Sequence, residues 1–141
     1  MTEKNNLIIA QTLLQRLADA PSALSVCELF AEDVLWNIPG NEAAYPWIGK
    51  QRGKGAVTQF ISESGKRLQR THFEVHDILA NERRAMIYGE LAAIDLVTEK
   101  SMVTPFVITL DISNGLINSF LMMENSVAVS EASQVVPNRK P

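Results

Sequence analysis

The sequence predicts an α+β fold in which three N-terminal helices pack on one face of a strongly curved, mainly antiparallel sheet. The period of the apolar residues predicts this fold. They recur every three or four positions in the first part of the chain, and every second position from Thr71 onward. A length of 141 residues with 46% hydrophobic residues supports a single core and is too short for two domains.

The three expected helices are separated by residues that break or cap a helix. Pro21 ends the first helix, and Ser22 can cap a second helix that runs toward Phe30. A third helix begins after Gly53 or Gly55. The apolar faces of the first and third helices contain Leu7, Ala10, Leu14 and Leu17, and Val57, Phe60, Ile61 and Leu68, respectively.

Four strands are expected after the helices. The first runs from Thr71 to a turn at 81–82, and the others cover 85–97, 102–112 and 116–125, which are rich in β-branched and aromatic residues. Between the last two, Ser113-Asn114-Gly115 predicts a tight hairpin because glycine adopts a positive φ without strain. The order of elements predicts one domain over residues 1–130, followed by a flexible C-terminal tail over 131–141.

Composition excludes several classes of function. A net charge of −3 without a basic run argues against nucleic acid and membrane surfaces as partners. No segment has the roughly 18 apolar residues of a membrane span, and the first residues do not resemble a signal peptide, so a cytoplasmic location is expected. The single Cys27 excludes an internal disulfide, and His72 and His76 could supply only half of a typical zinc shell. No metal or cofactor is therefore expected.

An aromatic segment lies between the second and third helices. Residues 35–40 and 45–49 hold both tryptophans, Trp36 and Trp47, and one of the two tyrosines, Tyr45. Such a loop is costly to leave in water. It either plugs the open end of the core or forms a mobile roof over a ligand pocket.

Five phrases of the sequence carry a resemblance to a known family: residues 28–34 (ELFAEDV), 36–40 (WNIPG), 46–49 (PWIG), 53–57 (GKGAV) and 113–117 (SNGLI). With these phrases, and over about residues 5–128, the chain resembles the SnoaL-like branch of the nuclear transport factor 2-like superfamily, which includes the ketosteroid isomerases. The resemblance implies a cone of three helices against a bent sheet, with a pocket inside. It also implies a homodimer through the outer face of the sheet.

The resemblance argues against two activities of the superfamily. The place of the carboxylate base of ketosteroid isomerases is matched by Ile38, and the places of their oxyanion-hole groups by Leu14 and Ile108. Aliphatic side chains cannot transfer a proton or donate a hydrogen bond, so the usual isomerase mechanism is not expected. The Asp-Arg-Asp set of limonene epoxide hydrolases is not matched either, since the arginine is missing and Met122 stands in place of a carboxylate.

Alternate residues of the strands are expected to line the implied pocket. Glu90 and Glu124 are the candidates for moving a proton, and Tyr88 for donating a hydrogen bond. A strand register shifted by one residue would instead place Glu90 on the outer face. The expected ligand-binding residues are Trp36, Ile38, Tyr45, Trp47, Phe60, Met86, Thr104, Phe106, Ile108, Phe120 and Met122.

Two functions of different class follow from this pocket. The first is an enzyme that performs acid–base chemistry, of isomerase, cyclase or hydrolase type, on a small hydrophobic molecule. The second is a non-catalytic module for ligand binding or dimerisation. A homodimer is expected in both cases, because the long strands carry apolar residues on both faces and one layer of helices covers only one face. His72 and His76 are expected on the surface or on the dimer face.

Overall fold

The computed structural model describes residues 2–18 and 22–135, and Pro21 and the tail over 136–141 lie outside the described residues. Ten elements follow one another along the chain. They are α1 (Glu3–Ala18), α2 (Ala23–Cys27), β1 (Phe30–Ile38), β2 (Gly49–Arg52), α3 (Lys54–Arg67), β3 (Leu68–Ala80), β4 (Arg84–Asp95), β5 (Ser101–Ser113), β6 (Leu116–Glu124) and α4 (Ser126–Ser133).

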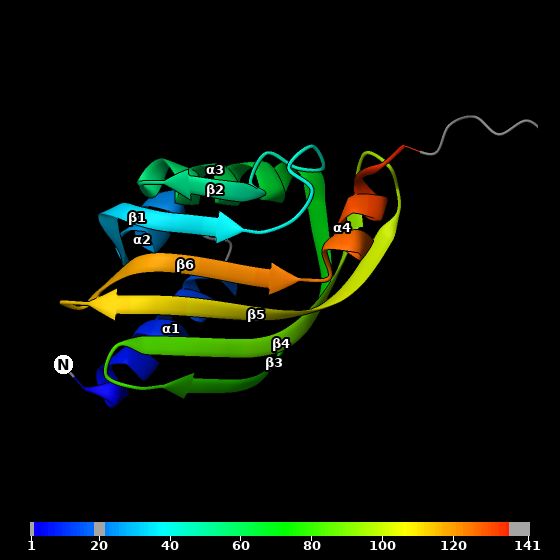
Figure 1. Ribbon diagram of the computed structural model, residues 1–141. Coiled ribbons are helices and arrows are strands. Elements are labelled where there is room, and N and C mark those ends of the chain that lie inside the picture. The colour runs from blue at the N-terminus through cyan, green and yellow to red at the C-terminus, as the bar shows by residue number, and fades with distance from the viewer. Residues whose placement is uncertain (1, 19–21, 136–141) are drawn as a thin grey trace, which may run out of the picture.

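The strands form one curved, mixed sheet in the order β2-β1-β6-β5-β4-β3. β1 and β6 are parallel, and the other four neighbouring pairs are antiparallel. The expected hairpin between β5 and β6 is present, with Asn114 at φ 54° and Gly115 at φ 77°. Figure 1 shows α1 and α2 behind the sheet and α4 beside the curved ends of β4 and β5. The prediction of an α+β fold with a curved, mainly antiparallel sheet is therefore confirmed.

The order of helices and strands differs from the prediction. β1 and β2 lie between α2 and α3, and α4 follows the last strand, so the helices are not confined to an N-terminal layer. Residues 30–38, expected as the end of a helix followed by a loop, form β1 instead. Val34, Trp36 and Ile38 alternate along it as buried residues, and its backbone pairs with β6. Asn125 caps α4 by accepting a hydrogen bond from the backbone of Ala128, and this helix extends past residue 130.

The two faces of the sheet have different surroundings. The inner face packs against the helices and forms the core, in which the Trp36 ring is stacked on Phe120 at a centroid distance of 4.1 Å. The outer face carries exposed apolar side chains, among them Met86, Val103 and Met123. No helix among the described residues has the length and apolar character needed to cross a membrane.

The expected orientation of β4 was wrong by one residue. Ala85, Ile87 and Ala93 are buried on the inner face, whereas Met86 and Tyr88 are exposed on the outer face. The error has a physical reason: apolar residues occupy both faces of this strand, so alternation alone cannot say which face is inner. The same shift moves Glu90 to the outer face, with its side chain 41% exposed.

Candidate functional site

A cavity of about 500 Å³ lies between the inner face of the sheet and the helices α1, α3 and α4. The sheet and each of these three helices contribute apolar side chains, and the segment between β1 and β2 adds the rings of Tyr45 and Trp47. Most of the wall is apolar, and it includes Ile38, Phe60, Leu91, Met102, Met122 and Val129. Such a wall favours a ligand whose surface is mainly apolar.

Glu124 supplies a carboxyl group to this apolar cavity. It is the last residue of β6, where the inward alternation of Phe120 and Met122 continues. The described residues include no hydrogen-bond or ion-pair partner for its side chain. Burial therefore disfavours the charged form and raises the pKa of Glu124 to about 7. At neutral pH this carboxyl exists in both protonation states, so it can either give or take a proton.

A second polar group stands behind the cavity wall. The Asp95 side chain is fully buried at the end of β4 and accepts hydrogen bonds from Tyr45 Oη at 2.7 Å and Arg67 Nε at 2.8 Å. Its Oδ1 also accepts from the backbone N–H groups of Val97 and Thr98. Burial by itself would raise the pKa of Asp95, but the bonds from Arg67, Tyr45 and the backbone outweigh it and hold the pKa at about 2. Asp95 is therefore an anion at neutral pH, and its hydrogen bonds fix Arg67 and Tyr45.

Tyr45 connects this buried pair to the cavity. Its ring is stacked on Trp47 at a centroid distance of 4.6 Å, and the Arg67 guanidinium lies 5.2 Å from its centroid. Burial and the hydrogen bond to Asp95 raise its pKa above the usual range, so the phenol stays neutral. Because its proton is donated to Asp95, the Tyr45 hydroxyl can offer a ligand only its oxygen, as an acceptor.

The structure separates the predicted site residues into three groups. Ile38, Tyr45, Trp47, Phe60, Met122 and Glu124 line the cavity. Trp36, Thr104, Phe106, Ile108 and Phe120 are buried in the core and do not line it. Met86, Tyr88 and Glu90 lie on the outer face, on the opposite side of the sheet. Glu124 is therefore not joined in the cavity by Glu90 or Tyr88, the two other residues predicted to act with it.

Sequence reasoning missed Asp95 and Arg67. The signal for Asp95 was present, because it shares its parity with Ala85, Ile87 and Ala93 and is the polar residue on that face of β4. With the correct register, an inward carboxylate at a strand end would have required a cationic partner. Arg67 carried no such signal, since a basic residue in the last turn of a helix is common on solvent-exposed helices.

The comparisons with known proteins agree with this architecture. The family model described as a SnoaL-like domain matches residues 15–120. No curated protein matches the sequence significantly. Many solved structures share the fold, and three of them illustrate its range.

An NTF2-like protein from Burkholderia xenovorans superposes with a TM-score of 0.85 at 18% identity, covering 95% of this chain and 99% of that one. TerC, co-crystallised with polyporic acid, superposes with a TM-score of 0.78 at 15% identity, covering 92% and 98%. A candidate polyketide cyclase from Xanthomonas campestris superposes with a TM-score of 0.74 at 14% identity, covering 94% and 98%. At these identities the likeness shows the fold alone.

Proposed function

The chain belongs to the SnoaL-like family of NTF2-like proteins, and from that premise we propose that it binds a small, mainly apolar molecule in its cavity and moves a proton on that molecule through Glu124. One observation carries the proposal: a carboxyl with a pKa of about 7 lines a mainly apolar cavity of about 500 Å³, in which Arg70, Ser64 and Tyr45 are the other polar side chains. A partly buried acid without a hydrogen-bond or ion-pair partner among the described residues costs stability, and groups of this kind cluster at functional sites.

The substrate class follows from what Glu124 and Tyr45 can exchange. A protonated Glu124 donates a hydrogen bond to a carbonyl oxygen, and an ionised Glu124 accepts a proton from an acidic C–H or O–H. The Tyr45 oxygen accepts a hydrogen bond from a hydroxyl. An aromatic or polycyclic ketone that also carries a hydroxyl offers a group for each of these interactions: its carbonyl and acidic C–H or O–H for Glu124, and its hydroxyl for Tyr45. The likeness in fold to a candidate polyketide cyclase, and to TerC with polyporic acid, supports this class.

A binding module without turnover is the second candidate. It is favoured by the aliphatic side chains at Leu14, Ile38 and Ile108, which the family resemblance matches to catalytic positions of ketosteroid isomerases. It is also favoured by Tyr45, whose proton is already committed to Asp95. In this case Glu124 would orient a ligand without exchanging protons with it.

Tryptophan fluorescence tests occupancy of the cavity, because the two tryptophans differ in position. Trp47 lines the cavity, and Trp36 is stacked on Phe120 in the core. An aromatic quinone such as polyporic acid is expected to quench the wild type and Trp36→Phe, and to have little effect on Trp47→Phe. Equal quenching of both variants, or none in the wild type, would place the ligand elsewhere. The same result would indicate that the segment with Tyr45 and Trp47 only closes the core and does not cover a ligand site.

A homodimer through the outer face is part of the proposal. Val103 is 66% exposed and Met123 46% exposed on this face, and an apolar patch of this kind usually marks an interface. Light scattering is expected to give twice the mass of one chain for the wild type at micromolar concentration. Val103→Lys and Met123→Lys should shift that mass toward one chain, whereas Leu24→Lys, an exposed leucine in α2, should not. A monomeric wild type would contradict the proposed homodimer.

We also propose a cytoplasmic location, which the single free Cys27 favours.

A further inference from the structure

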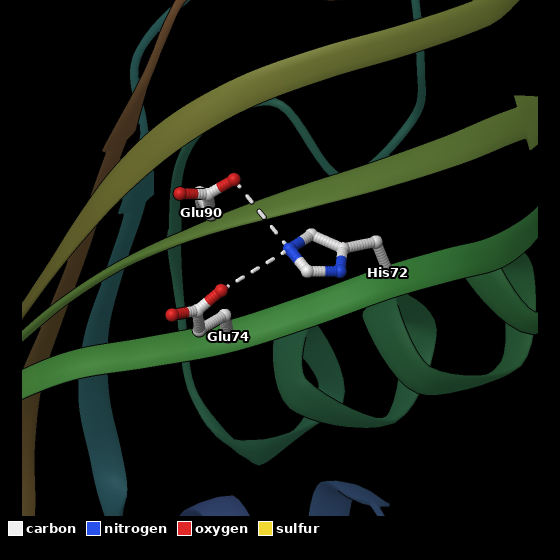
Figure 2. Close-up of side chains that lie close together, drawn as sticks. All are labelled: His72, Glu74 and Glu90. Atoms are coloured by element: carbon white, nitrogen blue, oxygen red, sulfur yellow. Dashed lines mark ion pairs between the residues drawn. The ribbon is translucent and has the colours of Figure 1, made fainter.

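Four titratable side chains meet on the outer face of the sheet, on the two strands at its β3 edge. His72, Glu74 and His76 alternate along β3 and therefore point to the same side, and Glu90 of β4 lies directly opposite Glu74 in the strand register. Figure 2 shows the carboxyl groups of Glu74 and Glu90 on the same side of the His72 ring, with one ring nitrogen directed at both. The cavity and its Glu124 lie on the other side of the sheet.

In this cluster each carboxyl group lies close to both histidine rings. His72 Nε2 lies 3.6 Å from Glu74 Oε1 and 3.4 Å from Glu90 Oε2. His76 faces the other oxygen of each carboxyl: its Nε2 lies 2.9 Å from Glu90 Oε1, within hydrogen-bond range, and its Nδ1 lies 3.5 Å from Glu74 Oε2. Each carboxyl group therefore turns one oxygen to His72 and the other to His76.

We propose that His72, Glu74 and Glu90 bind a divalent transition-metal ion, for which Zn²⁺ is the best match, and that His76 orients the Glu90 carboxylate. Ligands about 2.1 Å from a tetrahedral ion lie about 3.4 Å from one another. The two contacts of His72 Nε2, at 3.4 and 3.6 Å, fit that spacing and are too long for hydrogen bonds. The three ligand atoms lie within 4.8 Å of one another, so small side-chain movements suffice to close the site.

The chemistry of the ligands selects the metal. Imidazole nitrogen together with carboxylate oxygen suits Zn²⁺ and its neighbours in the first transition series, whereas Mg²⁺ and Ca²⁺ prefer oxygen alone. A hydrogen bond from His76 to the second oxygen of a bound Glu90 is the usual support for a metal-ligating carboxylate. Three protein ligands leave the fourth position open to water.

A metal also resolves an unfavourable feature of the strand pair. Glu74 and Glu90 are direct cross-strand neighbours of like charge, an arrangement that destabilises a sheet. In the single chain the side chains of this cluster are between 32% and 54% exposed. The sequence analysis predicts no metal because it counts only histidines and cysteines as ligands. The carboxylates of Glu74 and Glu90 supply the remaining ligands of the proposed site.

The test uses the only two histidines of the chain as reporters. The full-length protein, treated with EDTA and dialysed, is titrated with ZnCl₂ by calorimetry, and the imidazole C–H signals are followed by NMR. One Zn²⁺ per chain is expected, with both imidazole signals shifting at the same equivalence point. MgCl₂ is expected to shift neither.

Variants separate the site from adventitious binding. His72→Gln, Glu74→Gln and Glu90→Gln should each weaken Zn²⁺ binding at least about tenfold, and His76→Gln less than these three. Glu82→Gln removes an exposed glutamate from the β3–β4 turn and should leave affinity unchanged. Circular dichroism checks that each variant is folded, and Co²⁺ absorption gives a second readout on the wild type. Unmoved imidazole signals, or equal affinity in Glu90→Gln and Glu82→Gln, would overturn the proposal. Neither of these two results depends on Glu124 or the cavity, so the metal site can be tested separately from the proposed function.

Discussion

Replacing Asp95 by asparagine should lower the free energy of unfolding by about 3 kcal/mol at neutral pH. The substitution keeps the shape of the side chain but removes the charge that compensates Arg67, and it weakens the acceptor for Tyr45 Oη. Breaking one partner of a buried ion pair typically costs about 3–5 kcal/mol. The lower end applies because the Arg67 side chain keeps 27% exposure and can regain some hydration.

Asp111→Asn is the matched control for this measurement. Asp111 also accepts a hydrogen bond from an arginine, Arg84 Nε, but both side chains are exposed, at 39% and 51%. An exposed pair contributes at most about 1 kcal/mol. Chemical denaturation of both variants should therefore separate them by about 2 kcal/mol or more. Equal losses would mean that the Asp95 cluster does not stabilise the fold.

The same cluster predicts a pH dependence with a defined sign. The pKa of Asp95 is about 2 in the folded protein, below its ordinary value of 3.8. Its contribution to stability is therefore complete above about pH 5, where the unfolded chain is also ionised, and is lost progressively as the pH falls through 3.8 and then through about 2. The stability difference between the wild type and Asp95→Asn should shrink over this acidic range, as followed by denaturation at several pH values.

Replacing Glu124 by glutamine should stabilise the protein and abolish its chemistry. The pKa of Glu124 is about 7 when folded and returns to an ordinary value near 4.5 when unfolded. Folding therefore becomes less favourable as the pH rises from 4.5 to 7, and the full cost applies above pH 7. Removing the acid should raise the free energy of unfolding by about 3 kcal/mol at pH 8 and change it little at pH 4.

The chemical half of this prediction uses proton exchange. In D₂O, a ketone bound in the cavity should incorporate deuterium next to its carbonyl if Glu124 removes that proton. Glu124→Gln should stop this exchange while polyporic acid still quenches Trp47. Glu131→Gln, at an exposed glutamate of α4, should change neither stability nor exchange. Binding without exchange in the wild type would favour the binding module over the enzyme.

The fold could be predicted where a sequence pattern is compatible with only one local structure. The β5–β6 hairpin was predicted because few residues other than Asn114 and Gly115 adopt positive φ easily. β1 was missed because Trp36 and Pro39 in an aromatic stretch suggested a loop, and because it pairs on one side with the four-residue β2 and on the other with β6, some 80 residues away. A parallel pairing over that separation leaves no local signal. The capped helix α4 was missed because small and polar residues dominate its sequence.

The site could be predicted only in part. The inward alternation on β5 and β6 gave Glu124 and Met122 their correct side, since the opposite faces of those strands include polar residues such as Thr109 and Ser119. β4 offers no such contrast, so Tyr88 and Glu90 were placed inward when they lie outside. The bond between Tyr45 and Asp95 joins residues 50 positions apart and depends on tertiary packing alone.

The proposed function depends on Glu124 being a desolvated acid that exists in both charge states inside the cavity at neutral pH. A carbon-detected NMR titration of the glutamate side-chain carboxyl signals, with Glu124→Gln for assignment, tests it most directly. We expect a midpoint of about 7 for Glu124 in the free protein, and a displaced midpoint when polyporic acid is added. A midpoint near 4.5 that does not respond to the ligand would contradict it, since that carboxyl would then be an ordinary hydrated group.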